Sequence, residues 1–327
     1  YEVDKELKKR NLRDFTDQVL DTIKLFQNNH DLIPRFEHIL VDEFQDVNQM
    51  QVDLIKMLNA KNLFAVGDPR QAIYGWRGSQ VRYILEFPQI FSSNHEDPYQ
   101  DTQVVELKTN YRSKKQIVDF FNLAIKSLNL SDLKSSRERD DENSIFIMEQ
   151  DNEMLERRFV LEAIKNSKNP YCEIFVLART NKILDKFADF FAQNGINFAI
   201  KNEEDYANIN PQENQITLAT VHSIKGMEAK EVYLVSANNL SFPNKVVDNF
   251  VFSHMKSDND YDKEAEEERL FYVALSRAKE KLVITYTGNK SRFLTSKMLE
   301  HATVKEKNKN LFDYANSYSK KKKNEEK

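Results

Sequence analysis

Short apolar runs alternate along the chain with segments in which apolar residues recur at helical spacing. The runs end in polar residues and predict strands over 38–42, 63–67, 104–107, 145–148, 174–178, 216–221, 232–235 and 282–286. The helical spacing predicts helices over 49–58, 116–128, 154–164, 183–191 and 264–275. This alternation is typical of an α/β protein whose parallel sheets carry helices on both faces. In such folds we expect ligand chemistry outside the carboxyl edge of the sheet.

Composition narrows the class of protein. The 327 residues suffice for about two domains, which excludes a lone small module. The net charge of -4 excludes a histone-like polycation, so a nucleic acid would need a local basic or aromatic surface. A single cysteine, Cys172, excludes a disulfide framework and a cysteine-rich zinc module. No apolar run reaches the roughly 20 residues of a membrane span, and no signal peptide begins the chain, so we expect no membrane association and a cytoplasmic location.

Polar segments without apolar periodicity interrupt the alternation. Two of them, 129–143 and 202–214, are expected to be surface loops. From residue 305 onward the chain is rich in Lys and Asn and includes four consecutive lysines at 320–323. We therefore expect a Lys-rich disordered tail over 297–327, with binding to a phosphate backbone or to a partner as an option.

The first chemical motif is the string ILVDEFQD over 39–46. An apolar strand that ends in two carboxylates can place one of them, Asp42, on a Mg²⁺ ion. It can leave the other, Glu43, beside a water that attacks a γ-phosphate. The alternative is structural, because an acidic pair at a strand end commonly forms a helix cap or a solvated turn.

The second motif is the string GDPRQAIYGWRGS over 67–79, which holds three of the chain's six glycines and its only tryptophan. A glycine-rich loop with flat aromatic faces lets a backbone approach closely while bases stack on the rings of Tyr74 and Trp76. The alternative for Trp76 alone is a tight turn whose indole fills a core.

Together the two strings resemble motifs II and III of the UvrD/Rep/PcrA family of superfamily 1 helicases. Further strings follow in that family's order: LKTNYRS at 107–113 is similar to motif IV, FVLARTN at 175–181 to the strand and turn after it, TLATVHSIKGME at 217–228 to motif V, and EERLFYVALSRA at 267–278 to motif VI. The resemblance extends from about residue 11 to residue 294. It implies RecA-like motor domains of the P-loop NTPase type, with parallel sheets and helices on both faces.

The resemblance implies a reaction that uses ATP and Mg²⁺. Asp42 would hold the Mg²⁺ ion, and Glu43 would orient or deprotonate the attacking water. Gln71 would sense the γ-phosphate and report it to the DNA site.

Four residues of the later motifs receive nucleotide roles from the same resemblance. Tyr111 would stack on adenine, and Glu228 would contact the ribose. Arg112 and Arg277 would neutralise the charge that develops on the transferred phosphoryl group. Without the motif, an ion pair with the acidic stretch 264–268 would be the preferred explanation of Arg277.

The resemblance also implies a contact with single-stranded DNA. Tyr74 and Trp76 would stack on bases, and the string that they form with Arg77 resembles the DNA-directed branch of the family. Thr220 and His222 would touch the backbone of the strand. The alternative for His222 is a satisfied polar residue after a strand.

The family's P-loop, G-x-x-x-x-G-K-[ST], does not occur in the 327 residues. We therefore expect a P-loop-bearing segment upstream of Tyr1, on the same chain or on a partner chain. The resemblance then gives an incomplete first motor domain over 1–108 and a second motor domain over 109–296. No large helical insertion is expected, because the interval from Tyr111 to His222 fits only the motor domain itself.

An incomplete first motor domain has a consequence for stability. Its sheet would expose an unpaired, unpacked side around Leu40 and Ala65. We therefore expect the isolated 327-residue chain to be poorly stable or to associate.

Three functions are compatible with these observations. The first is an ATP-dependent DNA helicase that moves 3′ to 5′ on single-stranded DNA in repair or replication, with repair or replication proteins as further partners. The second is a catalytically dead, helicase-like module that binds single strands or serves as a scaffold, which the missing P-loop favours and the retained phosphate-cleaving residues oppose. The third replaces DNA by RNA, since base stacking tolerates either sugar.

Overall fold

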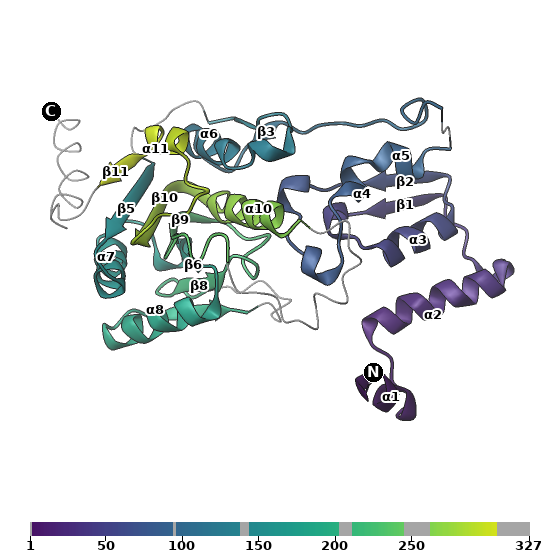
Figure 1. Ribbon diagram of the computed structural model, residues 1–327, viewed down its shortest axis with the longest axis horizontal. Coiled ribbons are helices and arrows are strands. Elements are labelled where there is room, and N and C mark those ends of the chain that lie inside the picture. Colours follow the sequence, from purple (N-terminus) through teal and green to yellow (C-terminus); the bar gives the residue numbers. More distant parts are fainter. Residues whose placement is uncertain (1, 94–95, 138–143, 203–210, 245–261, 306–327) are drawn as a thin grey trace. The chain divides into compact units, whose positions relative to one another are not determined.

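The computed structural model describes residues 2–93, 96–137, 144–202, 211–244 and 262–305 (Figure 1). The chain divides into two compact units, one formed by Tyr1–Val105 with Lys256–Asp262 and the other by Glu106–Met255 with Lys263–Lys327. The prediction of a disordered tail over 297–327 is wrong for residues 297–305, because they include most of helix α11 (Ser296–Glu300) and strand β11 (Thr303–Lys305), which pairs with a strand of the main sheet. The rest of that tail, 306–327, and the predicted loop residues 138–143 and 203–210 lie outside the described residues. Within the described ranges, no helix combines the length and the apolarity needed to cross a bilayer.

The first unit is built on a pair of parallel strands. β1 (His38–Val41) pairs with β2 (Asn62–Ala65), with Val41 opposite Ala65 at the carboxyl end. The connecting helix α3 (Gln49–Leu58) begins at Asn48, which forms a reciprocal capping box with Gln51. The other helices of this unit are α1 (Glu2–Lys9), α2 (Phe15–Asn28), α4 (Arg82–Leu85) and α5 (Phe87–Phe91).

One face of this strand pair is packed and the other is exposed. Val41 and Ala65 pack against a buried cluster that consists of Phe44, Val47, Val52 and Tyr83. Successive strand residues point to opposite faces, and Leu40 and Phe64 on the second face are 73% and 61% exposed. Two strands by themselves are marginally stable in water, so this unit has little support on that side.

We expect the isolated 327-residue chain to have low stability or to self-associate through the face that carries Leu40 and Phe64. Sedimentation velocity over a range of concentrations measures this, and replacing both residues by Gln should reduce the associated fraction. Leu240→Gln is the matched control, because Leu240 is an exposed leucine of the second unit. A monodisperse monomer with a sharp cooperative melting transition would contradict the expectation.

The second unit contains a seven-stranded sheet in the order β11-β5-β10-β9-β6-β8-β7, in which all neighbours are parallel. The strands are β5 (Ile145–Gln150), β6 (Ile174–Ala178), β7 (Phe198–Lys201), β8 (Ile216–Thr220), β9 (Ala229–Leu234), β10 (Ala278–Thr287) and β11 (Thr303–Lys305). The helices are α6 (Lys115–Leu123), α7 (Glu153–Lys165), α8 (Asn181–Gln193), α10 (Lys263–Leu275) and α11 (Ser296–Glu300). The short strands β3 (Thr109–Asn110) and β4 (Lys134–Ser135) pair separately.

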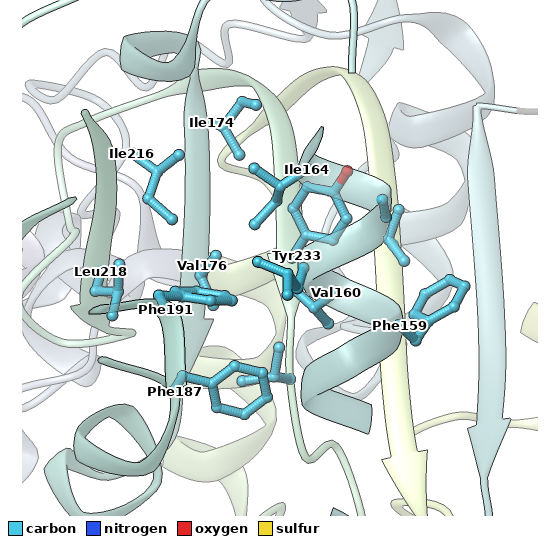
Figure 2. Close-up of a cluster of buried hydrophobic side chains, with 14 of the residues drawn as sticks. Phe159, Val160, Ile164, Ile174, Val176, Phe187, Phe191, Ile216, Leu218 and Tyr233 are labelled. Carbon is cyan, nitrogen blue, oxygen red and sulfur yellow. The ribbon is translucent and has the colours of Figure 1, made fainter. Parts of the chain in front are cut away.

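Both faces of this sheet are buried. On one face, Val176 and Tyr233 pack against Val160 of α7 and Phe187 of α8, as Figure 2 shows. The alternate strand residues, including Leu177, point to the opposite face and are also fully buried. Helices α6 and α10 contact β10, and the buried apolar residues of α10 lie outside the α7–α8 cluster. The predicted α/β fold, with a parallel sheet between helices, is therefore confirmed.

The structure confirms the predicted helices, although α6 ends at Leu123 rather than at residue 128. It confirms the predicted strands with one exception. The predicted strand over 104–107 is wrong, because in the described chain this segment pairs with no other strand and Val104, Val105 and Leu107 are exposed. The run lies where the first unit ends and the second begins, so its apolar residues do not enter a core.

Helix α7 carries a buried carboxyl group that should make folding depend on pH. Glu156 Oε1 accepts hydrogen bonds from the Ser236 backbone N at 2.7 Å and from Thr285 Oγ1 at 2.6 Å, and Oε2 accepts one from Ser236 Oγ at 2.9 Å. Burial raises the pKa of Glu156 above 4.5, and these hydrogen bonds only partly oppose the rise. The folded state therefore holds this proton more tightly than the unfolded state does.

We expect Glu156→Gln to reduce the pH dependence of the free energy of unfolding. A carboxyl group whose pKa is higher in the folded state than in the unfolded state stabilises the fold at pH values below its unfolded-state pKa. This stabilisation is lost as the pH rises through the folded-state pKa. Urea unfolding from about pH 5 to pH 8 should show a smaller decline in the variant than in the wild type. Glu162→Gln, on the same helix but partly exposed, is the control. Parallel curves for wild type and Glu156→Gln would contradict the assignment.

Candidate functional site

Two acidic residues follow β1 at its carboxyl end. Asp42 and Glu43 are exposed, and Asp42 Oδ1 accepts a hydrogen bond from the Glu43 backbone N at 2.7 Å. Glu43 has a φ of 50°, in the left-handed region that residues with a side chain adopt infrequently. Neither residue caps α3, since Asn48 does so. Both carboxylates therefore stand at the strand end within reach of solvent.

The loop that follows β2 lies beside this acidic pair. The Gln45 carboxamide contacts both Glu43 and the backbone N of Asp68. The Asp68 carboxylate in turn accepts a hydrogen bond from Gln71 Nε2 at 3.0 Å. The predicted residues Asp42, Glu43 and Gln71 are thus parts of one polar region at the carboxyl edge of β1 and β2.

The loop continues into an aromatic turn formed by residues 74–78. Trp76 is 49% exposed, which excludes the interpretation that its indole fills a core. The Arg77 guanidinium lies 4.4 Å from the centroid of the Trp76 ring and 5.0 Å from that of Tyr74. Gly78 closes the turn with a φ of 89°, which a side chain would oppose. The turn therefore places two aromatic rings and a guanidinium group in contact at the surface of the unit.

A second polar cluster lies in the other unit, at the amino edge of its sheet. Glu228 immediately precedes β9, and its carboxylate pairs with Arg112 Nε on one oxygen and with Lys279 Nζ at 3.0 Å on the other. Arg112 also donates to the carbonyl oxygen of Ser276 at 3.4 Å. Burial would raise the pKa of Glu228, but the hydrogen bond from Lys279 and the charge of Arg112 outweigh it and lower the pKa.

Arg277 belongs to the same edge, directly before β10. Its side chain is only 1% exposed. Its guanidinium donates to the carbonyl oxygens of Val273 at 3.1 Å and Met227 at 3.2 Å, and to Ser276 Oγ at 3.0 Å. The planar group is thus fixed between the end of α10 and the turn before β9. The cationic side chains of Arg112, Lys279 and Arg277 therefore all lie at the amino edge.

A turn stabilised by Asn110 presents the two residues of the predicted motif IV. Asn110 Oδ1 accepts hydrogen bonds from the backbone N of Arg112 at 3.0 Å and of Ser113 at 2.9 Å. Ser113 Oγ donates to the carbonyl oxygen of Ala278 at 2.6 Å, which ties the turn to the start of β10. Tyr111 at the tip of the turn is 78% exposed. Its ring is accessible for stacking on a flat ligand.

The two predicted backbone-binding residues of the second unit lie at the other edge of the sheet. Thr220 ends β8, and its buried hydroxyl is within 3.0 Å of Ser223 Oγ and accepts from the Ser223 backbone N at 3.2 Å. Thr220 therefore shapes the turn that carries the partly exposed His222. The residues expected to contact the nucleotide, Glu228 and Arg277, lie at the opposite, amino edge, so this sheet does not bring all its candidate residues to its carboxyl edge.

The donor set at Asp42 fits a magnesium ion. Among the residues that the structure describes, no three His, Cys, Asp or Glu side chains gather as a metal site would require. Mg²⁺ usually retains several waters and binds through one or two carboxylates together with phosphate oxygens. Asp42 can therefore serve as a protein ligand to a nucleotide-bound Mg²⁺.

Sequence reasoning missed two residues of these clusters. Lys279, which shares Glu228 with Arg112, stands one residue beyond the string that resembles motif VI. Gln45 lies inside the string that resembles motif II, but nothing in the string itself assigns it a partner. A signal for Lys279 exists in the sequence, because it stands near the start of a predicted strand, and the amino ends of neighbouring parallel strands lie at the same edge of a sheet.

Comparison with known protein families gives two matches. Residues 1–92 match the UvrD/REP helicase N-terminal domain. Residues 105–208 and 199–289 match the UvrD-like helicase C-terminal domain.

Two relatives found by sequence agree with these matches. A probable DNA helicase of Mycoplasma pneumoniae is 30% identical over 288 residues, which cover 84% of this chain and 49% of the relative. The ATP-dependent DNA helicase PcrA of Bacillus subtilis is 34% identical over 207 residues, which cover 60% of this chain and 27% of the relative. A crystal structure of the C-terminal domain of a possible DNA helicase from Lactobacillus plantarum aligns with a TM-score of 0.41 and 16% identity over 60% of this chain and 98% of that domain. The chain spans half or less of the length of the two helicases to which it is compared by sequence.

The UvrD-like helicase C-terminal domain matches more than half of the chain's residues. The chain therefore belongs to the UvrD-like superfamily 1 helicases.

Proposed function

We propose that this chain acts within an ATP-dependent translocase that moves 3′ to 5′ on single-stranded DNA and couples ATP hydrolysis to unwinding in repair or replication. Asp42 holds Mg²⁺, Glu43 activates the attacking water and Gln71 senses the γ-phosphate. The remaining nucleotide roles fall to Tyr111, Arg112, Glu228 and Arg277. Because the chain spans half or less of its relatives, tests of activity use the full-length gene product.

The observation that carries the proposal is the cationic cluster at the amino edge of the second unit's sheet. Catalysis of phosphoryl transfer depends on positioning and on charge neutralisation around the γ-phosphate. Arg277 is held by three hydrogen bonds, so its guanidinium requires little reorganisation when charge develops. The exposed ring of Tyr111, next in sequence to Arg112, supports stacking on adenine.

The aromatic turn supports the contact with single-stranded DNA. Half-exposed Trp76 and neighbouring Tyr74 offer ring faces to bases, and Arg77 supplies the charge that a phosphate backbone attracts. His222, on the turn after β8, contributes a further contact to the backbone, and Thr220 shapes that turn.

We expect Trp76→Ala to weaken binding of single-stranded DNA by roughly 5- to 150-fold, because stacking of a base on an aromatic ring contributes about 1 to 3 kcal/mol. Binding of an ATP analogue should change much less. Fluorescence anisotropy with labelled oligonucleotide and nucleotide measures both affinities. Phe36→Ala, at another half-exposed aromatic of the same unit, is the matched control. A larger loss of nucleotide affinity than of DNA affinity would contradict the assignment.

Direction of movement tests the proposed function. The full-length protein should displace streptavidin from a 5′-biotinylated single strand with ATP, and much more slowly from a 3′-biotinylated strand. Equal displacement from both ends, or preferential displacement from the 3′ end, would refute the polarity.

A second experiment tests which nucleic acid is bound. The protein's affinities for single-stranded DNA and RNA of the same sequence are measured at one salt concentration, and equal affinities would refute the preference for DNA.

A further inference from the structure

We propose that Gln45 is a positioning residue that holds the carboxylate of Glu43 and joins it to Asp68, and through Asp68 to Gln71. The inference rests on the proposed function, since it concerns how the water-activating carboxylate is oriented. Gln45 has no role in the proposed chemistry so far. Its side chain is 1% exposed, although it stands between two exposed acidic residues and a polar loop.

The hydrogen bonds of Gln45 fix the orientation of its carboxamide. Gln45 Nε2 donates to Glu43 Oε2 at 2.5 Å, and Gln45 Oε1 accepts from the Asp68 backbone N at 2.9 Å. A backbone N–H can only donate, and an ionised carboxylate can only accept. A carboxamide satisfies both partners in one orientation, and a carboxylate or an aliphatic side chain at position 45 would fail at one or both of them.

The packing around Gly67 gives independent support for the bridge from Glu43 through Gln45 to Asp68. A Cβ atom at position 67 would lie 2.3 Å from Gln45 Oε1 and 3.1 Å from the Gln45 backbone N. It would also lie 2.9 Å from Ile84 Cδ1. The absence of a side chain at Gly67 is therefore what allows the Gln45 carboxamide to reach Asp68.

The bridge continues beyond Asp68. Asp68 Oδ2 accepts from Gln71 Nε2 at 3.0 Å, and Asp68 Oδ1 accepts from the Arg70 backbone N at 3.0 Å. Gln45 thus links the turn after β1 to the turn after β2 through a series of side-chain hydrogen bonds. This link reaches the carboxylate of Glu43, a residue that is exposed and in a left-handed conformation.

Kinetics of variants in the full-length gene product test the role. Gln45→Met removes the carboxamide hydrogen bonds to Glu43, Asp46 and Asp68 at similar volume. We expect kcat for ATP hydrolysis to fall roughly 10- to 100-fold, because displacement of a reacting group by about 1 Å costs up to this much. KM for ATP should stay within about twofold, since ground-state binding does not involve this bridge. Gly67→Ala, which displaces the carboxamide without altering Gln45, should lower kcat in the same way.

The variant Gln45→Glu separates positioning from packing. It keeps an acceptor for the Asp68 backbone N at similar volume, but it places a second acceptor against Glu43, where the wild type places a donor. We therefore expect kcat of Gln45→Glu to fall at least as far as that of Gln45→Met, whereas a role in packing alone would leave Gln45→Glu close to wild type. The other charged groups in contact with this network, Asp46 and Arg70, are common to all variants. Gln51→Glu, at the cap of α3, is the matched control.

A readout that does not depend on activity separates this inference from the proposed function. In protein labelled with ¹⁵N-glutamine, the Gln45 side-chain NH₂ should exchange slowly with solvent, and Glu43→Ala should shift its resonance and speed its exchange. If the wild type shows this coupling but no ATP hydrolysis, the proposed function fails and the bridge stands. A rapidly exchanging Gln45 amide overturns the bridge at any hydrolysis rate. A wild-type kcat in a folded Gln45→Met variant overturns the positioning role.

Discussion

Glu43→Gln should lower the rate of ATP hydrolysis by about 100- to 10,000-fold while ATP remains bound, which is the range that loss of a general base produces. Gln keeps the size of the side chain and removes the group that accepts the proton of the attacking water. Asp42 remains in place as the proposed Mg²⁺ ligand, so nucleotide affinity should be kept. Steady-state hydrolysis and equilibrium binding of an ATP analogue, both on the full-length gene product, measure the two quantities.

The control for this variant is Glu37→Gln, which makes the same substitution at an exposed glutamate just before β1. It should hydrolyse ATP at the wild-type rate. Hydrolysis by Glu43→Gln at the wild-type rate would remove Glu43 from the reaction. Loss of ATP binding together with hydrolysis would instead assign Glu43 to nucleotide binding.

Arg277→Lys should lower kcat for ATP hydrolysis by roughly 1,000-fold or more, because an arginine that stabilises the transferred phosphoryl group contributes about 10³- to 10⁵-fold. Lysine keeps the positive charge but lacks the planar fork that donates to Val273, Met227 and Ser276 in the present arrangement. The effect should therefore appear mainly in kcat, with a smaller change in KM for ATP.

Because Arg277 is buried, its substitution must be separated from unfolding. Thermal unfolding of Arg277→Lys and of the wild type, compared by circular dichroism, provides that check. Arg292→Lys is the matched control, since Arg292 is an exposed arginine of the same unit that pairs with Glu264. A folded Arg277→Lys variant with wild-type kcat would show that Arg277 serves packing alone.

The sequence predicted most of the second unit because its strands are apolar on both faces. In β6, Ile174, Phe175 and Val176 are consecutive and all buried, so the run is evident without knowledge of its neighbours. The edge strand β7 was not predicted, since its apolar run is only Phe198–Ile200 and is followed by a lysine, Lys201, that is buried. Local pattern therefore identifies central strands better than edge strands.

The sequence did not predict the contacts between segments that are distant along the chain. Val104, Val105 and Leu107 have the composition of a strand, but no described strand lies beside them. Gln45 and Lys279 acquire their partners only when neighbouring strands bring the preceding or following turns together. Such partners depend on sheet order, which periodicity does not contain.

Sheet order also separates the candidate site residues of the second unit. Glu228 and Arg277 precede their strands and lie at the amino edge, whereas Thr220 and His222 follow β8 at the carboxyl edge. The position of each residue relative to its own strand is visible in the sequence. The sequence did not show that the residues proposed for the nucleotide and those proposed for the DNA backbone lie at opposite edges of one sheet. This became evident only from the parallel order of the strands.

The measurement that tests the proposed function most directly is the steady-state rate of ATP hydrolysis by the full-length gene product, with and without single-stranded DNA. We expect Mg²⁺-dependent hydrolysis that single-stranded DNA stimulates and that Glu43→Gln abolishes. Binding of single-stranded DNA without hydrolysis, at any DNA or Mg²⁺ concentration, would contradict the proposal and indicate a helicase-like binding module instead.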